Sequence, residues 1–321
     1  MASGVDVTVI LGTGGTIAGE AAAPGEALRY SAARIGIDSL VRAVPALAGL
    51  ALQAEQVAQV DSKDMDHAIW AALARRCAAH LARPEVAGLV VTHGTDTLEE
   101  TAWLLHRVLG HDGGPAKPVV LTAAMRPATS LQADGPQNLL DAVTVARSPG
   151  ARGVMVVMAG TVFHPQAVRK HHTWRLDAFA AGDDGAVGHV VDGCLHRSRP
   201  WPEACALGLT CLPPPGTPWP RVEVVMNHAG ADGRVVELLM ADGVDGLVLA
   251  GTGNGTLSDP LARAARRAQA AGVVVWRASR CAAGGVVGGG PGDFYPAGAL
   301  SPAQARVSLT LALLAQPSGT G

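Results

Sequence analysis

Residues 90–101 read VVTHGTDTLEET and pass from an apolar, β-branched run through a short turn into a helical stretch. Residues 87–92 predict a buried strand, because a nearly continuous apolar run is typical of parallel strands that are covered on both faces. Residues 98–109 predict a helix, and Thr97 followed by Glu100 has the form of a capping box. This strand–turn–helix unit indicates an α/β fold.

The same alternation continues along the chain. Further strands are predicted at 7–11, 119–123, 154–158, 222–226, 247–250 and 273–276, and further helices at 65–81, 137–147, 261–271 and 302–314. Prolines are concentrated in residues 200–220, where they oppose a central strand. We therefore predict two doubly wound α/β domains: a larger, flavodoxin-like catalytic domain with a parallel sheet (1–199), a Pro-rich linker (200–220) and a smaller C-terminal α/β domain (221–321).

Composition excludes several classes of function. With 48% hydrophobic and 16% charged residues the chain has ample material for a packed core. Its 25 Lys and Arg against 27 Asp and Glu give a net charge of −2, so no basic excess favours nucleic acid or an anionic membrane. The N-terminal residues lack a signal-peptide pattern and no apolar run could span a bilayer, which predicts a cytoplasmic protein if Met1 is the native start. The five cysteines are dispersed without a CxxC pair, and we expect buried, reduced thiols.

A glycine-rich turn follows the first predicted strand. Residues 11–19 read LGTGGTIAG, which departs from a dinucleotide fingerprint because Ile17 stands where the third glycine belongs. Gly14 and Gly15 remove side chains at the carboxyl end of a strand, where α/β proteins bind ligands, and Thr16 would be displayed there. The alternative is an ordinary Gly-rich turn whose threonine bonds only the backbone.

The turn in residues 90–101 offers a second set of polar groups. Thr95 and Asp96 would face the same crevice as Thr16 if the two strands are near neighbours. The helix N-terminus that follows adds free N–H groups suited to an oxyanion, and Asp96 could hold a substrate ammonium or simply cap the helix. A lysine can activate a threonine hydroxyl only where its surroundings let it lose a proton, so Lys170 is either that base or a solvated lysine.

Residues 13–19 and 92–101 together resemble the two signature motifs of the bacterial-type L-asparaginases and glutaminase-asparaginases. The resemblance runs over nearly the whole chain and includes 124–127, 133–139 and 253–255. It implies hydrolysis of the side-chain amide of L-asparagine to L-aspartate and ammonia through a β-aspartyl-enzyme, with comparable L-glutamine activity as the alternative. No cofactor and no metal are implied.

The resemblance also implies catalytic roles. Thr16 resembles the loop threonine that attacks the amide, and Tyr30 resembles the tyrosine of a mobile lid that assists it. Thr95, Asp96 and Lys170 resemble a second, buried triad that polarises or activates a nucleophile.

Substrate-binding roles follow from the same resemblance. Ser62 resembles the serine that binds the substrate α-carboxylate, Asp96 would bind the α-amine, and Gly15 and Gly94 join this set with Thr95. Asn254 resembles a residue that a neighbouring subunit lends to the site, which implies a homotetramer built as a dimer of dimers.

Two departures from the family pattern bear on affinity. Lys63 stands where many members have glutamine, and its cation either strengthens carboxylate binding or points to solvent. Secreted members lend an acidic residue from a neighbouring chain between Arg280 and Gly298, and here the only acid in that stretch is Asp293. Asp293 either replaces it or the substrate ammonium loses a counter-charge.

Three competing hypotheses remain open. The chain could be the amide-hydrolysing subunit of a tRNA-dependent amidotransferase, although neither an extra N-terminal domain nor a basic RNA footprint is evident. It could be an amino-acid-binding module without turnover, which the intact threonines and Lys170 oppose. A metal site is disfavoured because His106 and His111 are five residues apart, which is not the spacing of two ligands on one helical face.

Overall fold

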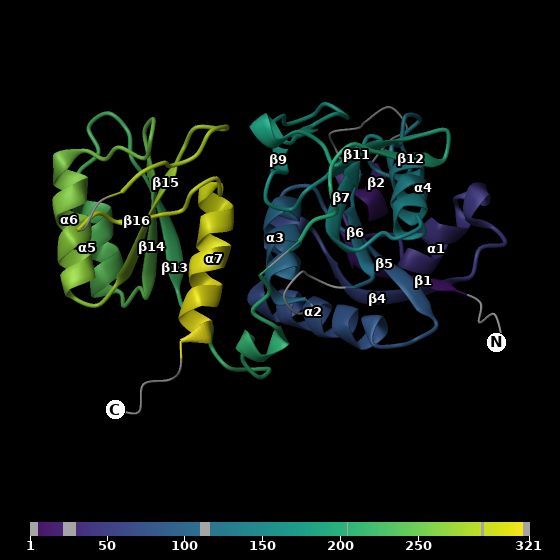
Figure 1. Cartoon of the computed structure of the whole chain (residues 1–321), viewed down its shortest axis with the longest axis horizontal. Coiled ribbons are helices and arrows are strands. Elements are labelled where there is room, and N and C mark those ends of the chain that lie inside the picture. The colour runs from purple at the N-terminus through teal and green to yellow at the C-terminus, as the bar shows by residue number, and fades with distance from the viewer. Residues whose placement is uncertain (1–5, 22–29, 110–115, 204, 290–291, 317–321) are drawn as a thin grey trace. The chain divides into compact units, whose positions relative to one another are not determined.

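The computed structural model describes residues 6–21, 30–109, 116–203, 205–289 and 292–316 (Figure 1). Two compact units, Met1–Leu209 and Thr210–Gly321, divide the chain. The division between them lies inside the proline-rich segment 200–220.

An eight-stranded sheet forms the centre of the first unit. Its parallel part consists of β1 (Val7–Gly14), β4 (Leu52–Val60), β5 (Val86–Thr92), β6 (Pro118–Thr122) and β7 (Gly153–Met158). These strands are ordered β4-β1-β5-β6-β7. Numbered along the chain this is 2-1-3-4-5, the order of the flavodoxin-like fold. The predicted α/β class and the doubly wound parallel arrangement are confirmed.

Helices cover both faces of this sheet (Figure 1). Alternate strand residues face opposite sides, and Ile10, Val90 and Val120 pack in one cluster with α1 (Ile37–Arg42) and α4 (Gly135–Ala146). The helices α2 (His67–Leu81) and α3 (Leu98–Val108) contribute nothing to that cluster, contact each other and pack on β4, β5 and β7. Because both faces are covered, the central strands carry the continuous apolar runs seen in the sequence.

Short strands extend and decorate the sheet, and the sequence patterns did not predict them. The strands β8 (Thr161–Phe163), β11 (Gly188–Val191) and β12 (Cys194–Arg197) continue the sheet beyond β7 in antiparallel pairing. Two ribbons stand apart from it, β2 (Glu20–Ala21) with β3 (Tyr30–Ser31) and β9 (Arg169–Lys170) with β10 (Phe179–Ala180). Strands of two to four residues are too short to show a periodicity.

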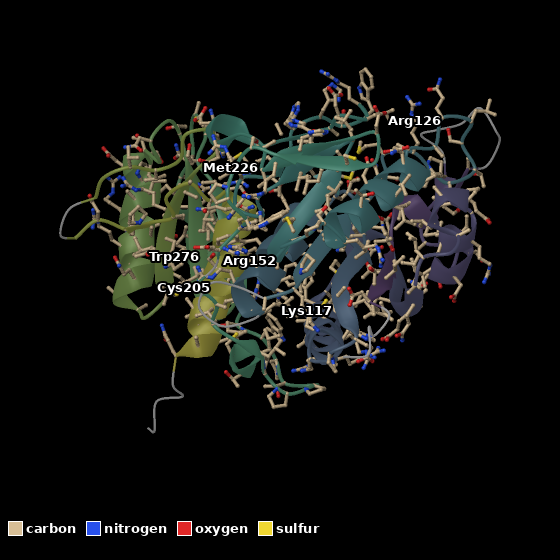
Figure 2. All side chains as sticks on the ribbon, turned by 45° about the vertical axis from the view of Figure 1, so that its right-hand side comes forward. Lys117, Arg126, Arg152, Cys205, Met226 and Trp276 are labelled. Atoms are coloured by element: carbon tan, nitrogen blue, oxygen red, sulfur yellow. The ribbon has the colours of Figure 1, made fainter. Side chains whose placement is uncertain are left out.

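The second unit is a smaller three-layer α/β structure. All pairs in its sheet of β13 (Val222–Met226), β14 (Gly246–Gly251), β15 (Val274–Ser279) and β16 (Tyr295–Pro296) are parallel. Leu247 and Leu249 pack with α5 (Arg234–Ala241) and α6 (Asp259–Ala270), whereas Val248 packs with α7 (Pro302–Ala315). Met226, labelled in Figure 2, ends the edge strand β13 and is exposed.

The cysteines correct one expectation. Cys77 is fully buried in α2, and burial raises the pKa of its thiol to about 12. Cys194, Cys205 and Cys281 are exposed and Cys211 is half-buried, so the expectation of buried thiols is wrong for most of them. In the part of the chain that the structure describes, no helix has the length and apolar character needed to cross a bilayer.

Candidate active site

Three neighbouring strands of the first unit end at one edge of the sheet. The first strand, β1, lies between β4 and β5 and runs parallel to both. The strand order reverses there, and ligands of doubly wound sheets bind outside the carboxyl ends of the strands at such a point. Ser62, Thr16 and Thr95 follow β4, β1 and β5 respectively. The two threonine-bearing turns therefore come from adjacent strands, which was the condition for their sharing a crevice.

Glycines let these three turns touch. Gly15 has a φ of 79°, and a Cβ on it would lie 2.3 Å from the Cα of Gly94. A Cβ on Gly94 would in turn lie 2.4 Å from the Oγ of Ser62. Real Cβ atoms do not approach other atoms so closely, so a side chain at either glycine would push the turns apart. This contact brings the residues that follow, Thr16 and Thr95, to a common edge of the sheet.

Thr16 is paired with Tyr30. The two hydroxyl oxygens are 2.7 Å apart, Thr16 is buried, and Tyr30 is more than one-third exposed on β3. Burial raises the pKa of the Tyr30 phenol, the carboxylates of Asp61 and Asp96 raise it further, and the bond to Thr16 opposes this. Tyr30 is therefore an un-ionised phenol at neutral pH, which can give up its own proton while it accepts another.

Lys170 reaches this edge from the β9–β10 ribbon. Its Nζ donates to Thr95 Oγ1 at 2.9 Å and to Asp96 Oδ1 at 2.5 Å. Its backbone N–H donates to the Glu99 carboxylate at 3.0 Å, which anchors the ribbon to the first turn of α3. The Lys170 side chain is only one-fifth exposed. Lys170 is thus a member of a three-residue cluster and not the solvated lysine that was its alternative.

Ser62 joins the turn after β4 to the start of α3. Its buried Oγ accepts from the Asp96 N–H at 3.2 Å, and its carbonyl accepts from the Thr97 hydroxyl at 2.8 Å. Thr97 is the N-cap residue of α3, but its side chain makes no capping bond. The predicted capping box is therefore wrong, because the Thr97 hydroxyl is used to hold Ser62 in place.

Lys63, Asn254 and Asp293 were also predicted to bind substrate, and the structure shows the contacts or the unit of each. Lys63 is ion-paired with Asp64, and both side chains are largely exposed. Asn254 belongs to the second unit, where its side-chain amide donates to the Val287 carbonyl at 2.9 Å and accepts from the Val287 N–H at 2.8 Å. Asp293 is also in the second unit.

Glu99 and the strand β4 were missed by sequence reasoning. Glu99 lies in the predicted helix 98–109 but was assigned no role at the site, and its hydrogen bond to Lys170 spans 71 positions of the chain. The strand β4 has a mixed burial pattern because it is the edge strand of the sheet. The signal that was available is positional: Ser62 stands just after residues 52–60, LQAEQVAQV, in which polar and apolar residues alternate over 52–55 and again over 58–60.

Hydroxyl, carboxylate and amine groups make up the cluster. Over the described ranges of the chain, no group of three or more His, Cys, Asp or Glu side chains could hold a metal ion. His106 packs against His164 with ring centroids 5.1 Å apart, and His111 lies outside the described residues. Such an arrangement can supply a hydroxyl nucleophile, a fixed carboxylate and an amine hydrogen-bond donor to a small polar substrate.

Comparison with known proteins identifies the family. The family model "Asparaginase, N-terminal" matches residues 7–202, and "Glutaminase/Asparaginase C-terminal domain" matches residues 221–319. The chain is 37% identical to "L-asparaginase 2" of Escherichia coli (strain K12) over 95% of its own length and 88% of that protein. It is 35% identical to "Glutaminase-asparaginase" of Pseudomonas fluorescens biotype A over 95% and 85% of the two lengths. The crystal structure of "Probable Cytoplasmic L-asparaginase" from Campylobacter jejuni superposes with a TM-score of 0.89 at 35% identity, covering 96% of this chain and 95% of that one. The chain therefore belongs to the asparaginase family, as its sequence, its fold and its two motif-bearing turns all show.

Proposed function

We propose that this protein is an L-asparaginase, an amidohydrolase that converts L-asparagine to L-aspartate and ammonia. The observation that carries the proposal is the pair of hydroxyl clusters, Thr16–Tyr30 and Thr95–Lys170–Asp96, on turns that touch at Gly15 and Gly94. A nucleophile with a hydrogen-bonded partner, next to a second hydroxyl with its own amine and carboxylate, is the arrangement that acyl transfer requires.

The reaction proceeds by double displacement. The Thr16 Oγ adds to the side-chain carbonyl carbon, and the carbon–nitrogen bond then breaks. Tyr30 accepts the Thr16 proton while passing its own to the departing nitrogen, which leaves as ammonia. Water next adds to the β-aspartyl ester, and its cleavage restores the Thr16 hydroxyl and releases L-aspartate. The un-ionised state of Tyr30 suits this relay, because the phenol ends each step with the number of protons it began with.

Ser62 and Asp96 would hold the backbone groups of the substrate. Ser62 Oγ accepts from the Asp96 N–H, which leaves its own hydroxyl proton for the substrate α-carboxylate. The Asp96 side chain is about half exposed at the same edge and can accept from the α-ammonium.

Replacing Ser62 tests this binding role. A hydrogen bond to a charged group contributes about 1.5–3 kcal/mol, so we expect Ser62→Ala to raise KM for L-asparagine by roughly 10- to 100-fold. Lys63→Gln is the matched control next to it, and because an exposed ion pair contributes little its KM should stay within about threefold of wild type. Steady-state kinetics of both variants decide, and equal KM values for Ser62→Ala and wild type would contradict the assignment.

Comparable hydrolysis of L-glutamine is the second candidate. It is favoured by the similarity to a protein named glutaminase-asparaginase. The two substrates differ by one methylene, and a pocket discriminates such a difference by only about 1–3 kcal/mol. We propose asparagine as the preferred substrate.

Ammonia release by the purified full chain tests the proposal. L-asparagine, L-glutamine and D-asparagine are assayed side by side at one enzyme concentration, with and without EDTA. We expect the fastest release from L-asparagine and no effect of the chelator. If no ammonia is released from any of the three amides, the protein is an amino-acid-binding module and not an amidohydrolase. If EDTA abolishes the activity and added metal restores it, the reaction depends on a metal ion.

The quaternary and cellular setting is also proposed by similarity. We infer a cytoplasmic homotetramer, built as a dimer of dimers, in which the segment of Asn254 meets a neighbouring subunit's site. Within the described residues the Asn254 amide bonds only Val287, and its second N–H and second lone pair could serve a substrate. The cytoplasmic location is supported by the similar structure from Campylobacter jejuni, which is named "Probable Cytoplasmic L-asparaginase".

A further inference from the structure

A fully buried chain of hydrogen bonds ends behind the turn that carries Thr95. His93 has no exposed surface, its Nδ1 is 2.7 Å from the Gly94 carbonyl, and its Nε2 is 2.9 Å from Thr101 Oγ1. Trp70 Nε1 is 2.8 Å from the same Thr101 oxygen. The proposed reaction steps use none of these three side chains.

The chemistry of the groups gives every bond in this chain a direction. The indole N–H of Trp70 can only donate, so Thr101 Oγ1 accepts it and has its own proton to give. The Gly94 carbonyl can only accept, so the proton of His93 is on Nδ1, and Nε2 accepts from the Thr101 hydroxyl. Burial lowers the pKa of His93 to about 4, which leaves the ring with this single proton at neutral pH. Donation therefore runs from Trp70 through Thr101 and His93 to the carbonyl of Gly94.

This chain fixes the orientation of one peptide plane. In a trans peptide the C=O and the following N–H point in opposite directions. Because His93 holds the Gly94 carbonyl toward the core, the Thr95 N–H is directed away from it. Among the described residues no acceptor is found for the Thr95 N–H. A buried backbone donor without a protein partner, beside a proposed nucleophile, is suited to a negatively charged oxygen that forms during the reaction.

We propose that His93 is a positioning residue that, by bonding the Gly94 carbonyl, aims the Thr95 N–H at the oxyanion of the substrate. The proposal rests on the amide hydrolysis proposed above. His93 does not itself exchange a proton with substrate, since both ring nitrogens are occupied and its partner on the active-site side is a carbonyl. Its effect should accordingly be on kcat, because the oxyanion exists in the transition state and not in the bound substrate.

A pair of substitutions separates the two bonds of His93. In His93→Asn the side-chain amide nitrogen can stand where Nδ1 stands, so the bond to Gly94 is kept and the bond to Thr101 is lost. In His93→Gln the amide oxygen can stand where Nε2 stands, so the bond to Thr101 is kept and the bond to Gly94 is lost. Asparagine is the smaller residue and leaves the larger void, so a role in packing alone favours the Gln variant.

Steady-state kinetics of ammonia release from L-asparagine test the proposal, with thermal melting as the measure of folding. We expect kcat of His93→Gln to fall by about 10²-fold with KM within about twofold, and kcat of His93→Asn to stay within about fivefold of wild type, although it melts at the lower temperature. A Gln variant that turns over as fast as the Asn variant, or a loss confined to KM, overturns the proposal.

A second pair keeps the test decisive if the His93 variants do not fold. Thr101→Ser retains the hydroxyl that sets the His93 tautomer, whereas Thr101→Val removes it. We expect kcat near wild type for the serine variant and about tenfold lower for the valine variant, and equal kcat values contradict the proposal. If the wild-type protein releases no ammonia from any amide, the proposed function has failed. If the variants are active but their kcat values do not follow the expected order, only the proposal for His93 has failed.

Discussion

Thr16→Ala is expected to lower ammonia release from L-asparagine by at least about 10³-fold, because it removes the atom that forms the acyl bond. The Thr16 hydroxyl is bonded to Tyr30, so its loss should leave the packing of the unit intact. The measurement is kcat at saturating substrate, together with far-UV circular dichroism to confirm the fold.

Thr16→Ser is the matched control for this prediction. It keeps the hydroxyl and loses one methyl group from a buried side chain, so turnover should stay well above that of the alanine variant. If Thr16→Ala retains a tenth or more of wild-type turnover, Thr16 is not the nucleophile.

Lys170→Met is the second change with a large expected effect. It removes the amine that donates to both Thr95 and Asp96 and leaves a hydroxyl and a carboxylate without that partner. A preorganised hydrogen-bond donor in an active site typically contributes about 10²–10³-fold, so we expect kcat to fall by about that factor. Kinetics on L-asparagine, with binding of L-aspartate measured separately by calorimetry, separate catalysis from affinity.

The control for Lys170→Met is the same substitution at Lys63. That lysine is exposed and paired with Asp64, and Lys63→Met should keep kcat within about threefold of wild type. Similar losses in the two variants would show that the effect of Lys170 is one of general charge and not of its bonds to Thr95 and Asp96.

Much of the fold was predictable because its central strands are buried on both faces. The strands predicted at 87–92 and 119–123 coincide closely with β5 and β6. They could be predicted because nearly every residue in them is apolar. The edge strand β4 was missed because none of its residues is fully buried, so it lacks the continuous apolar run of the central strands. The β9–β10 ribbon was missed because each strand has two residues and is defined by its partner.

Some features of the candidate site could likewise be predicted from the sequence and others could not. Thr16 and Thr95 were predicted because each follows a strong strand signal in a glycine-bearing turn. The contact of Gly15 with Gly94 and the bond of Glu99 to Lys170 join segments more than 70 residues apart, and no local pattern encodes such distances. At Thr97 a local pattern was misleading. The sequence has the form of a capping box, but the Thr97 hydroxyl donates to the carbonyl of Ser62 instead of capping the helix.

Trapping the covalent intermediate tests the central claim most directly. The full chain is mixed with L-asparagine, quenched in acid within a fraction of one turnover, digested and examined by mass spectrometry. We predict a β-aspartyl group on the peptide that contains Thr16, absent from the Thr16→Ala variant. An aspartyl adduct on the peptide that contains Thr95, with the Thr16 peptide unmodified, would contradict the account.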